Sequence, residues 1–572
     1  MNWDNIVSFF GMLFSFDDKY PLLFTQFYFW AFFAIVFAGF ALIGNKILLR
    51  NGFLFFVSML FYYKTSGLFL LLLILTTLLC FYSGKKIDQT DNPTKRKFFL
   101  IFGVTINLAI LAYFKYAYFF TEVYNSLFNS EFEVINYLAK WTNEATGTDH
   151  FNATRILLPV GISFYTFQSI SYVIDVYRRR IDHVTNIFNF GFFVTFFPQL
   201  VAGPIVRANQ FMPQLYKKFF LTKRQFGIAV FWILNGLLKK IILSDYIAVN
   251  FVDRVFDHPL LFTSFENLFA LFGYSLQVYA DFSGYTDIAI GVAMLMGFYL
   301  PINFNSPYKA TNPGDFWRRW HISLSTWLKD YLYIPLGGNK KGKLRTNINL
   351  MTTMLLGGLW HGASWNFVIW GGLNGIGIVI FKWWRKLRKS SKTLITFLLF
   401  AFFVFLEFKF SKPVFMIGMV WSGVIFFGSL VNYLYFIISH RDPIRWANRG
   451  WSIFLTFVFI TFTRLFFRSG SNLDPVEANA TAWNTAKNMV NQIGGTWNLK
   501  LIPDILNSYK YVVILFVLGM IIHWLPAKWK QWYRINFALL PVWAIGIIVV
   551  ISVFIVYQFI TADLQPFIYF QF

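Results

Sequence analysis

The sequence has few charged residues and almost no cysteine. Cys80 is the single cysteine among 572 residues, so a disulfide framework and a cysteine-based metal site are both excluded. Charged residues make up 13% of the chain, against about 25% in an ordinary soluble protein. Hydrophobic residues reach 57%, and phenylalanine alone occurs 75 times. A soluble globule of this length has too little interior to bury so much apolar surface, and the composition therefore predicts an integral membrane protein.

The charges that are present are strongly unbalanced. Lysine and arginine number 50 and aspartate and glutamate 26, which gives a net charge of +24. A basic chain can be a nucleic-acid binder, but here the basic residues lie in loops between apolar runs that are too long for a soluble fold. This arrangement is typical of a multi-pass membrane protein with basic cytoplasmic loops. We therefore expect contact with membrane lipid and no nucleic-acid partner.

Apolar runs long enough to span a bilayer recur along the whole chain. A span needs roughly 17–25 mainly apolar residues. Ten runs meet this condition: 22–44, 98–120, 156–177, 225–250, 267–300, 393–410, 414–438, 451–467, 508–525 and 536–560. Three further apolar runs do not behave as simple spans: 53–83, 187–202 and 348–381.

The charge of the loops between these runs predicts their side of the membrane. Seven loops together carry +27: 84–97, 178–186, 203–224, 301–347, 382–392, 440–450 and 526–535. Three others together carry −5: 121–155, 251–266 and 468–507. The positive-inside rule places the basic set in the cytoplasm and the other three outside. Since 187–202 and 348–381 are flanked by basic loops at both ends, each is expected to enter and leave the membrane on the cytoplasmic side.

His361 is the strongest candidate for chemistry. It lies in the middle of the second of these runs, in the segment GGLWHGASW at 357–365. Glycines interrupt helices, and irregular backbone at membrane depth must be buried in protein or line a cavity. Burial favours the neutral imidazole, which is the form that a general base requires. A hydrogen-bonded core histidine is the alternative, and the flanking glycines and the absence of a neighbouring lysine or arginine in the sequence favour the functional role.

His321 lies in a run of aromatic and charged residues at 315–330. This run includes Trp317, Arg318, Arg319 and Lys329. Adjacent arginine forks suit the binding of phosphate groups, which indicates a cytoplasmic site for an anion. An interfacial helix with an aromatic belt and snorkelling arginines would have the same composition. The residues alone leave both possibilities open.

Asp281 and Asp287 lie in another apolar stretch, LQVYADFSGYTDIAIG. Carboxylates inside a membrane need partners. A proton pathway is one interpretation, and structural pairing with arginines or backbone N–H groups is the commoner one.

The motifs of soluble metal and nucleotide enzymes are missing. The segment GGNKKGK at 337–343 approaches a phosphate-binding loop, but Leu344 stands where a serine or threonine should bind Mg²⁺. The sequence has neither an H-E-x-x-H zinc motif nor a G-x-S-x-G nucleophile turn. We therefore expect no metal ion and no tightly bound cofactor.

Several long blocks of the sequence resemble the membrane-bound O-acyltransferase (MBOAT) family, in particular its bacterial polysaccharide (alginate-type) O-acetyltransferase branch. The blocks are LLPVGISFYTFQSISYVIDVYRRR (157–180), FFPQLVAGPIVRANQFMPQL (196–215), LQVYADFSGYTDIAIG (276–291), FNSPYKATNPGDFWRRWHISLSTWLKDYLYIPLGGNKKG (304–342) and GGLWHGASWNFVIWGGLNG (357–375). The segments RNGFLFFVSMLFYY and the terminal PFIYFQF are also similar to this branch, whereas 121–155 and 468–507 match it poorly.

The resemblance implies an all-α polytopic integral membrane protein of the MBOAT fold. Its tilted transmembrane helices would form a ring, with re-entrant hairpins around a central tunnel. A single membrane domain would then cover 1–572, with its core at 157–380, N-terminal helices at 1–156, C-terminal helices at 393–572 and extracytoplasmic loops at 121–155 and 468–507. The location implied is the bacterial inner (cytoplasmic) membrane.

The resemblance also implies the activity and the roles of residues. His361 matches the family's catalytic histidine within the membrane, and His321 matches its second polar catalytic position. Acetyl-CoA is the expected acyl donor, and the expected acceptor is an extracytoplasmic polysaccharide, reached through a separate SGNH-hydrolase-like subunit. The residues expected to bind the donor are Trp317, Arg318, Arg319 and Lys329. The residues expected to line or support the tunnel are Trp360, Ser364, Asn366, Asp281 and Asp287.

Two other functions remain open at this point. The same family includes a D-alanyl transferase for teichoic acids, which takes its acyl group from an acyl carrier protein. A non-enzymatic transporter of polysaccharide precursors has weaker support, because the sequence shows no duplicated halves. The residues favour acetyl transfer but do not identify the polymer.

Overall fold

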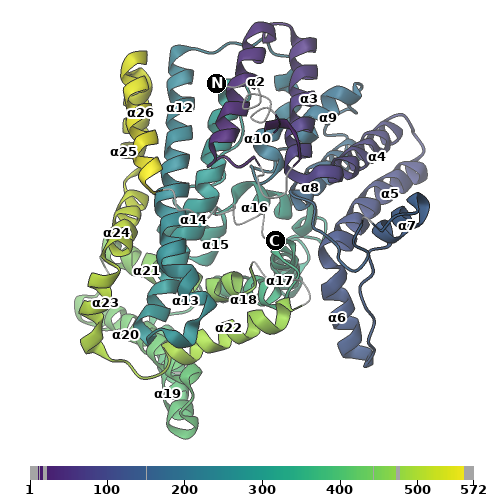
Figure 1. Cartoon of the computed structure of the whole chain (residues 1–572). Helices are drawn as coiled ribbons and strands as arrows, with labels where there is room; N and C mark the ends of the chain where they lie inside the picture. Colours follow the sequence, from purple (N-terminus) through teal and green to yellow (C-terminus); the bar gives the residue numbers. More distant parts are fainter. Residues whose placement is uncertain are drawn as a thin grey trace.

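The computed structural model describes residues 11, 13–16, 22–149, 151–441, 444–471 and 477–559 (Figure 1). Within these ranges the chain folds into helices and contains no β-strand. The predicted all-α class is therefore confirmed. The terminal block PFIYFQF lies outside the described residues.

The helices follow one another with π-helical and 3₁₀ segments at several junctions. The first half of the chain contains α2 (Phe27–Ile43), α3 (Ile47–Ser66), α4 (Leu70–Asp88), α5 (Pro93–Leu111), α6 (Ala117–Phe128), α7 (Tyr137–Thr146), α8 (Ile162–Tyr177), α9 (Ile187–Thr195), α10 (Phe197–Leu200), α11 (Ala208–Leu215), α12 (Lys223–Leu237), α13 (Asp253–Asp257) and α14 (Ser264–Leu295). The second half contains α15 (Pro313–Trp317), α16 (Ile322–Leu328), α17 (Gly342–His361), α18 (Trp365–Trp384), α19 (Lys389–Phe410), α20 (Pro413–Ser439), α21 (Arg445–Ser469), α22 (Ala478–Ile493), α23 (Ile502–Ser508), α24 (Lys510–Trp524), α25 (Ala527–Leu539) and α26 (Val542–Phe559).

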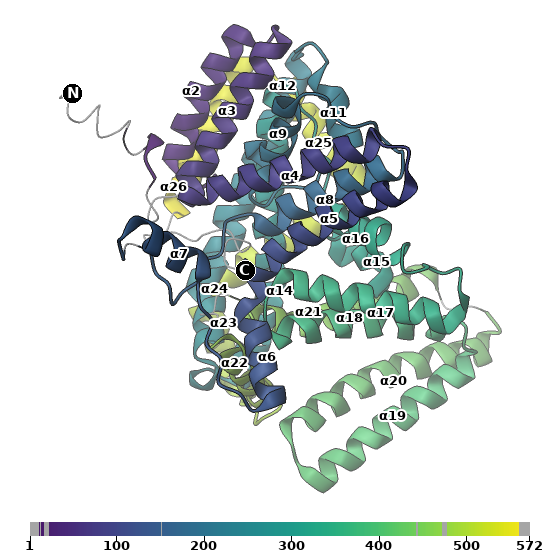
Figure 2. The same cartoon turned by 90° about the vertical axis from the view of Figure 1, so that its right-hand side faces the viewer.

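Many of these helices have the length and composition of membrane spans. Eight helical segments in the described part of the chain are long and apolar enough to cross a membrane, and the pair α23 and α24, bent by 85°, is a ninth candidate. The helices α19 and α20 form a hairpin whose apolar side chains are mostly exposed, as expected for a surface in contact with lipid (Figure 2). The protein is therefore a multi-pass membrane protein.

Two of the expected spans, 156–177 and 267–300, correspond to helices that are buried among other helices. α14 has 32 residues and is buried along most of its length, but its polar residues leave it less apolar than the eight candidate spans. α8 has 16 residues, fewer than the roughly 20 that a span requires, and is also buried. An apolar run in the sequence therefore does not distinguish a helix in contact with lipid from one buried among other helices.

The helices α12 and α14 pack closely together at small residues. A Cβ atom added to Gly236 would lie 2.5 Å from a backbone oxygen of α14, so only glycine allows this approach. Beyond α12 the chain continues as the π-helical segment Leu238–Asp245. Its Lys239 pairs with Asp287 of α14 at 2.6 Å, and its Lys240 pairs with Asp281 of α14. The two carboxylates thus have the structural partners expected for them, although these partners are lysines and not arginines or backbone N–H groups.

The hairpin expected at 348–381 is formed by α17 and α18, which lie side by side (Figure 2). Added Cβ atoms on Gly358 and Gly371 would each lie 2.3 Å from a backbone oxygen of the opposite helix. These two glycines therefore allow the helices to cross at close range. His361 is the last residue of α17, directly before the turn at 362–364. The hairpin thus carries the candidate histidine at its tip.

The other two unusual runs are also interrupted. The run 187–202 forms α9 and α10, which are short and buried. The run 53–83 is divided between α3 and α4, which change direction at the 3₁₀ turn Gly67–Phe69 (Figures 1 and 2).

The three loops assigned to the outside contact one another. Arg468 pairs with Asp253 at 3.0 Å, which joins 468–507 to 251–266. The Asn479 side chain donates a hydrogen bond to the carboxylate of Glu122, which joins 468–507 to 121–155. Segments that the charge rule places on one side therefore meet in the fold.

The basic loops also contact one another. Arg207 pairs with Asp330 at 2.7 Å, which joins 203–224 to 301–347. His183 pairs with Asp88 at 2.6 Å, which joins 178–186 to 84–97. Four of the basic loops are thus paired with another loop of the same set.

Candidate active site

The two candidate histidines come together although forty residues separate them in the sequence. His361 lies at the end of α17 and His321 directly precedes α16. Their ring centroids are 6.4 Å apart, and neither residue is more than 2% exposed. In the described part of the chain, no three His, Cys, Asp or Glu side chains are grouped so that they could hold a metal ion. The arrangement favours proton transfer by imidazole groups.

Aromatic rings surround this pair. The His361 ring lies 4.9 Å from Trp360, 5.0 Å from Trp370 and 5.3 Å from Phe467, measured between ring centroids. The His321 ring lies 5.9 Å from Trp360, so this tryptophan lies beside both histidines. Such surroundings offer few polar groups that could form competing hydrogen bonds with the imidazoles. Electrostatic interactions within these surroundings are stronger than in water.

The backbone and the partner of His321 both indicate a fixed orientation. Its φ angle is 43°, in the left-handed region that non-glycine residues rarely adopt. The side-chain oxygen of Asn303 accepts hydrogen bonds from the backbone N–H and the hydroxyl of Ser323, at 3.0 and 2.9 Å. His321 Nδ1 lies 3.3 Å from the same oxygen, which can only accept. Nδ1 therefore carries the proton of the neutral imidazole, and the lone pair is on Nε2.

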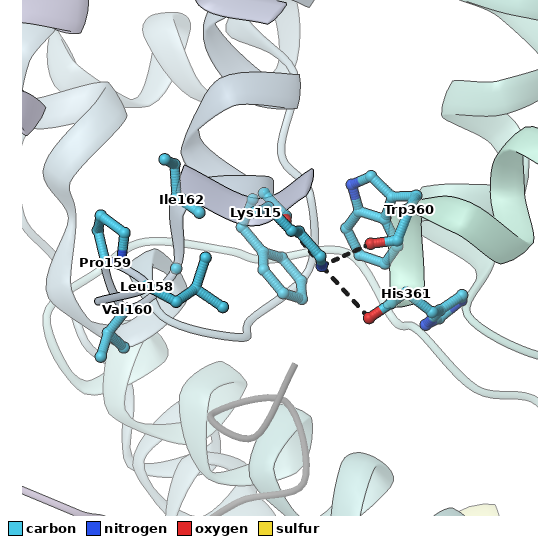
Figure 3. Close-up of a pocket in the computed structure, with 10 residues that line it drawn as sticks. Lys115, Leu158, Pro159, Val160, Ile162, Trp360 and His361 are labelled. Carbon is cyan, nitrogen blue, oxygen red and sulfur yellow. Dashed lines mark hydrogen bonds between the residues drawn. The ribbon is translucent and has the colours of Figure 1, made fainter. Parts of the chain in front are cut away.

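Lys115 holds the end of α17 that carries His361 (Figure 3). It lies in the π-helical segment Ala112–Tyr116, and its Nζ donates to the backbone oxygens of Trp360 at 2.7 Å and His361 at 3.2 Å. Ser163 Oγ lies 3.3 Å from the same nitrogen. The last carbonyl groups of a helix have no partners within the helix and carry its negative dipole end, so an ammonium group stabilises them.

The neighbouring Tyr116 adds a further hydrogen bond from the same π-helical segment. Its hydroxyl donates to the backbone oxygen of Leu359 at 2.9 Å. No lysine or arginine adjoins His361 in the sequence, but Lys115, which is distant in sequence, is adjacent to it in space. The feature of the sequence that indicates this contact is the presence of a lysine within the apolar run 98–120.

A pocket reaches the histidine from the side of Lys115. It has an empty volume of about 380 Å³. Lys115, Trp360 and His361 line it together with residues 158–164 (Figure 3). Its lining is mainly apolar, with one ammonium group and the backbone of the Pro159–Phe164 segment. The 380 Å³ includes open solvent, and the pocket thus opens from the surface toward the imidazole.

The tip of the hairpin is covered by the segment 468–507, which is assigned to the outside. Asn366 donates to Ser469 Oγ at 2.7 Å and to the backbone oxygen of Ala482 at 3.0 Å. The Trp365 backbone N–H donates to the Asn479 side chain at 2.8 Å. Ser364 is buried, and its hydroxyl has no hydrogen-bond partner in the described ranges. The side chain of Asn366 thus has a structural role at the tip.

The structure places the four residues expected to bind the donor in different surroundings. Trp317 packs on Trp370 at 5.6 Å and donates to the side chain of Asn374 at 3.3 Å, so it supports the wall of the histidine site. Arg319 pairs with Asp315 at 3.1 Å. Arg318 and Lys329 are exposed. The two exposed side chains are therefore the ones available to an approaching anion.

A further group of lysines lies beside the 301–347 loop. Lys530 donates to Ser306 Oγ at 2.9 Å and to the backbone oxygen of His523 at 2.7 Å. Burial, together with the charges of Lys309 and Lys239, lowers the pKa of Lys530 to about 8. Burial also lowers the pKa of Lys309. The mutual repulsion shows a concentrated positive potential at this face.

Comparison with known proteins assigns a family to this architecture. The sequence profile of the membrane-bound O-acyltransferase family matches residues 177–421, a range that includes both histidines but not Lys115. The chain is 40% identical over 335 residues to the probable alginate O-acetylase of Pseudomonas putida, covering 58% of this chain and 65% of that protein. It is 35% identical over 391 residues to the peptidoglycan O-acetyltransferase of Helicobacter pylori, covering 63% and 70%. It is 29% identical over 258 residues to the teichoic acid D-alanyltransferase of Bacillus subtilis, covering 43% and 64%. The match thus spans just under two thirds of the alginate relative's length.

Proposed function

Because this chain belongs to the membrane-bound O-acyltransferase family, we propose that it transfers an acetyl group from a cytoplasmic thioester to a hydroxyl group at the buried histidine pair. The observation that carries this proposal is the pair itself: two histidines 6.4 Å apart, buried in aromatic surroundings and reached by a pocket. Relatives named as O-acetyltransferases of alginate and of peptidoglycan support acetyl as the transferred group.

His361 is the general base in the proposed reaction. It removes the proton of the acceptor hydroxyl as the oxygen attacks the thioester carbonyl carbon. The new C–O bond forms, the C–S bond breaks, and the departing thiolate takes the proton from the imidazolium. His321, with its Nδ1 proton directed at Asn303, presents Nε2 and orients the acceptor. The competing route, in which His361 itself carries the acetyl group, predicts a protein-bound acetyl label after donor is added without acceptor.

The proposed donor is acetyl-CoA, and the proposed acceptor system lies outside the cytoplasmic membrane of a bacterium. The exposed Arg318 and Lys329 and the lysine group around Lys530 provide the positive potential that attracts CoA phosphates. The outer segments around the hairpin tip would receive an SGNH-hydrolase-like subunit that passes the acetyl group to a polysaccharide.

The test of this proposal is a comparison of two labelled donors. Membranes containing the protein are given either labelled acetyl-CoA or a carrier protein loaded with labelled D-alanine. We expect label to be transferred from acetyl-CoA. Transfer from the D-alanyl carrier alone would overturn the proposal in favour of the second candidate, which the 29% identical teichoic acid relative supports.

Removal of the exposed charge at Arg318 tests the proposed approach of the donor. In the variant Arg318→Gln we expect the KM for acetyl-CoA to rise about three- to tenfold at low salt, and the difference to shrink at high salt because ions screen exposed charges. The matched control is Lys500→Gln, which removes one exposed positive charge from a segment assigned to the outside. An unchanged KM in Arg318→Gln, or an equal rise in the control, would contradict a donor-binding role for Arg318.

A further inference from the structure

A second cation lies in the core near the histidines and has no role in the mechanism above. Arg464 lies on α21, outside the range matched by the family profile, and is 1% exposed. Its guanidinium carbon is 4.0 Å from the centre of the Trp320 ring and 5.8 Å from that of Phe467. Stacking on aromatic faces stabilises a guanidinium group but leaves its N–H groups without acceptors.

Those N–H groups are unsatisfied in the described part of the chain. None of the three nitrogen atoms of the Arg464 guanidinium group has a hydrogen-bond partner there. The hydroxyl of Tyr308 lies close enough to interact with the guanidinium group, and it donates its own proton to the backbone oxygen of Ser275. Burial of a charge without acceptors is strongly unfavourable, and such a charge inside a membrane protein is by default the mark of a functional site.

Three other cations in the described part of the chain have partners within the fold, in contrast to Arg464. Arg468, one turn further along α21, pairs with Asp253 at 3.0 Å. Lys240 pairs with Asp245 at 2.8 Å, and Lys115 donates to the carbonyl groups at the hairpin tip. Arg464 has no carboxylate or carbonyl partner of this kind in the described ranges, which leaves its N–H groups available to a bound group.

The position of Arg464 identifies that partner. Trp320, on which it stacks, is adjacent to His321 in the chain, and Phe467, its other aromatic neighbour, contacts the His361 ring at 5.3 Å. Arg464 is also close enough to His361 for its charge to act on the imidazole. During the proposed reaction, the acyl carbonyl is the polar group that has to come close to the two histidines.

We propose that Arg464 binds the oxygen of the acyl carbonyl and stabilises the negative charge that develops on it; this inference rests on the proposed function. When the acceptor oxygen bonds to the carbonyl carbon, the π electron pair moves onto the carbonyl oxygen and the guanidinium N–H groups donate to it. When the C–S bond breaks, the pair returns to restore the C=O bond. Preorganised donors of this kind act strongly in a site from which water is excluded.

Kinetics of the variant Arg464→Met provide the first test. We expect kcat for acetyl transfer to fall by about 100-fold or more, while the KM for the donor changes by less than about threefold, since the interaction forms mainly in the transition state. Arg464→Lys, which keeps the charge, should recover part of kcat. The matched control is Arg449→Met on the same helix, where the side chain is exposed and activity should be unchanged.

Thermal unfolding of the same variants separates this role from a structural one. A buried charge without partners destabilises the resting protein, so Arg464→Met should unfold at the same temperature as the wild type or a higher one. A structural arginine would instead give a lower unfolding temperature and unchanged turnover per folded molecule. That result, or full activity in Arg464→Met, would overturn the proposal.

The same kinetic measurements also distinguish two other outcomes. In one, Arg464 binds an oxygen of a different ligand, and in the other the proposed function itself fails. A rise in the KM for the acceptor with kcat intact would mean that Arg464 binds a carboxylate of the acceptor, which overturns the carbonyl assignment. If the wild type transfers neither labelled acetyl nor labelled D-alanine, the proposed function fails. If the wild type is active and Arg464→Met equals it, only the inference about Arg464 fails.

Discussion

Replacement of His361 with alanine is expected to lower acyl transfer by roughly 10³-fold, the scale of general base catalysis. The imidazole is the group beside the pocket with a lone pair suited to removing the proton of a hydroxyl, and its surroundings of Trp360, Trp370 and Phe467 favour the neutral ring. The measurement is donor-dependent acetylation in membranes that contain equal amounts of wild type and variant.

The control for this prediction is His440→Ala, because His440 is exposed at the end of α20. It should acetylate at the wild-type rate. Wild-type rates in His361→Ala would refute the catalytic assignment. Transport of a polysaccharide precursor that survives this substitution would instead support the non-enzymatic alternative.

The position of His361 and the hairpin that carries it could be predicted because their signals are local. The charged flanks of 348–381 and the glycines around the histidine are both legible in one stretch of sequence. The structure shows the hairpin, and Gly358 and Gly371 show how its two helices approach. Charge patterns and small residues act over short distances along the chain, so one sequence is enough to interpret them.

The supporting residues could not be predicted in the same way. Lys115 and Arg464 each stand alone inside an apolar run, and nothing in the sequence states which end of which helix they meet. Their partners are 245 and 144 positions away along the chain, at Trp360 and Trp320. Likewise the sequence of α14 does not show whether it contacts lipid, and only its packing against α12 shows that it is buried. Long-range packing decides these assignments, and local patterns do not encode it.

The separation of the loops by charge has a similar limit. It grouped segments that do contact each other, such as 121–155 and 468–507 through Glu122 and Asn479. It could not show that 468–507 covers the hairpin tip at Trp365 and Asn366. This poorly matching outer segment is thus adjacent to the proposed reaction centre, where an acceptor specific to this protein would arrive.

Replacement of Lys115 with methionine is expected to lower kcat by about 10- to 100-fold with a smaller change in KM. The substitution leaves the carbonyl groups of Trp360 and His361 without their donor, and each unsatisfied buried group costs roughly 1–3 kcal/mol. The end of α17 should then shift or fray. A displacement of the imidazole by about 1 Å is enough for a 10²-fold loss, because catalysis depends on a near-attack geometry.

Two further variants and a local probe make this prediction specific to positioning. Tyr116→Phe removes only the hydrogen bond to Leu359 and should have a smaller effect in the same direction. Lys140→Met makes the same replacement at an exposed position of α7 and should change nothing.

In Lys115→Met, hydrogen–deuterium exchange should rise in the hairpin segment 357–364 and remain unchanged in α12 and α14. Unchanged exchange in that segment together with wild-type kcat would show that the ammonium group does not position His361. Exchange that rises throughout the protein would show a general loss of stability. A local rise accompanied by a fall in kcat is the result expected if Lys115 acts on the reaction through the backbone that carries the histidine.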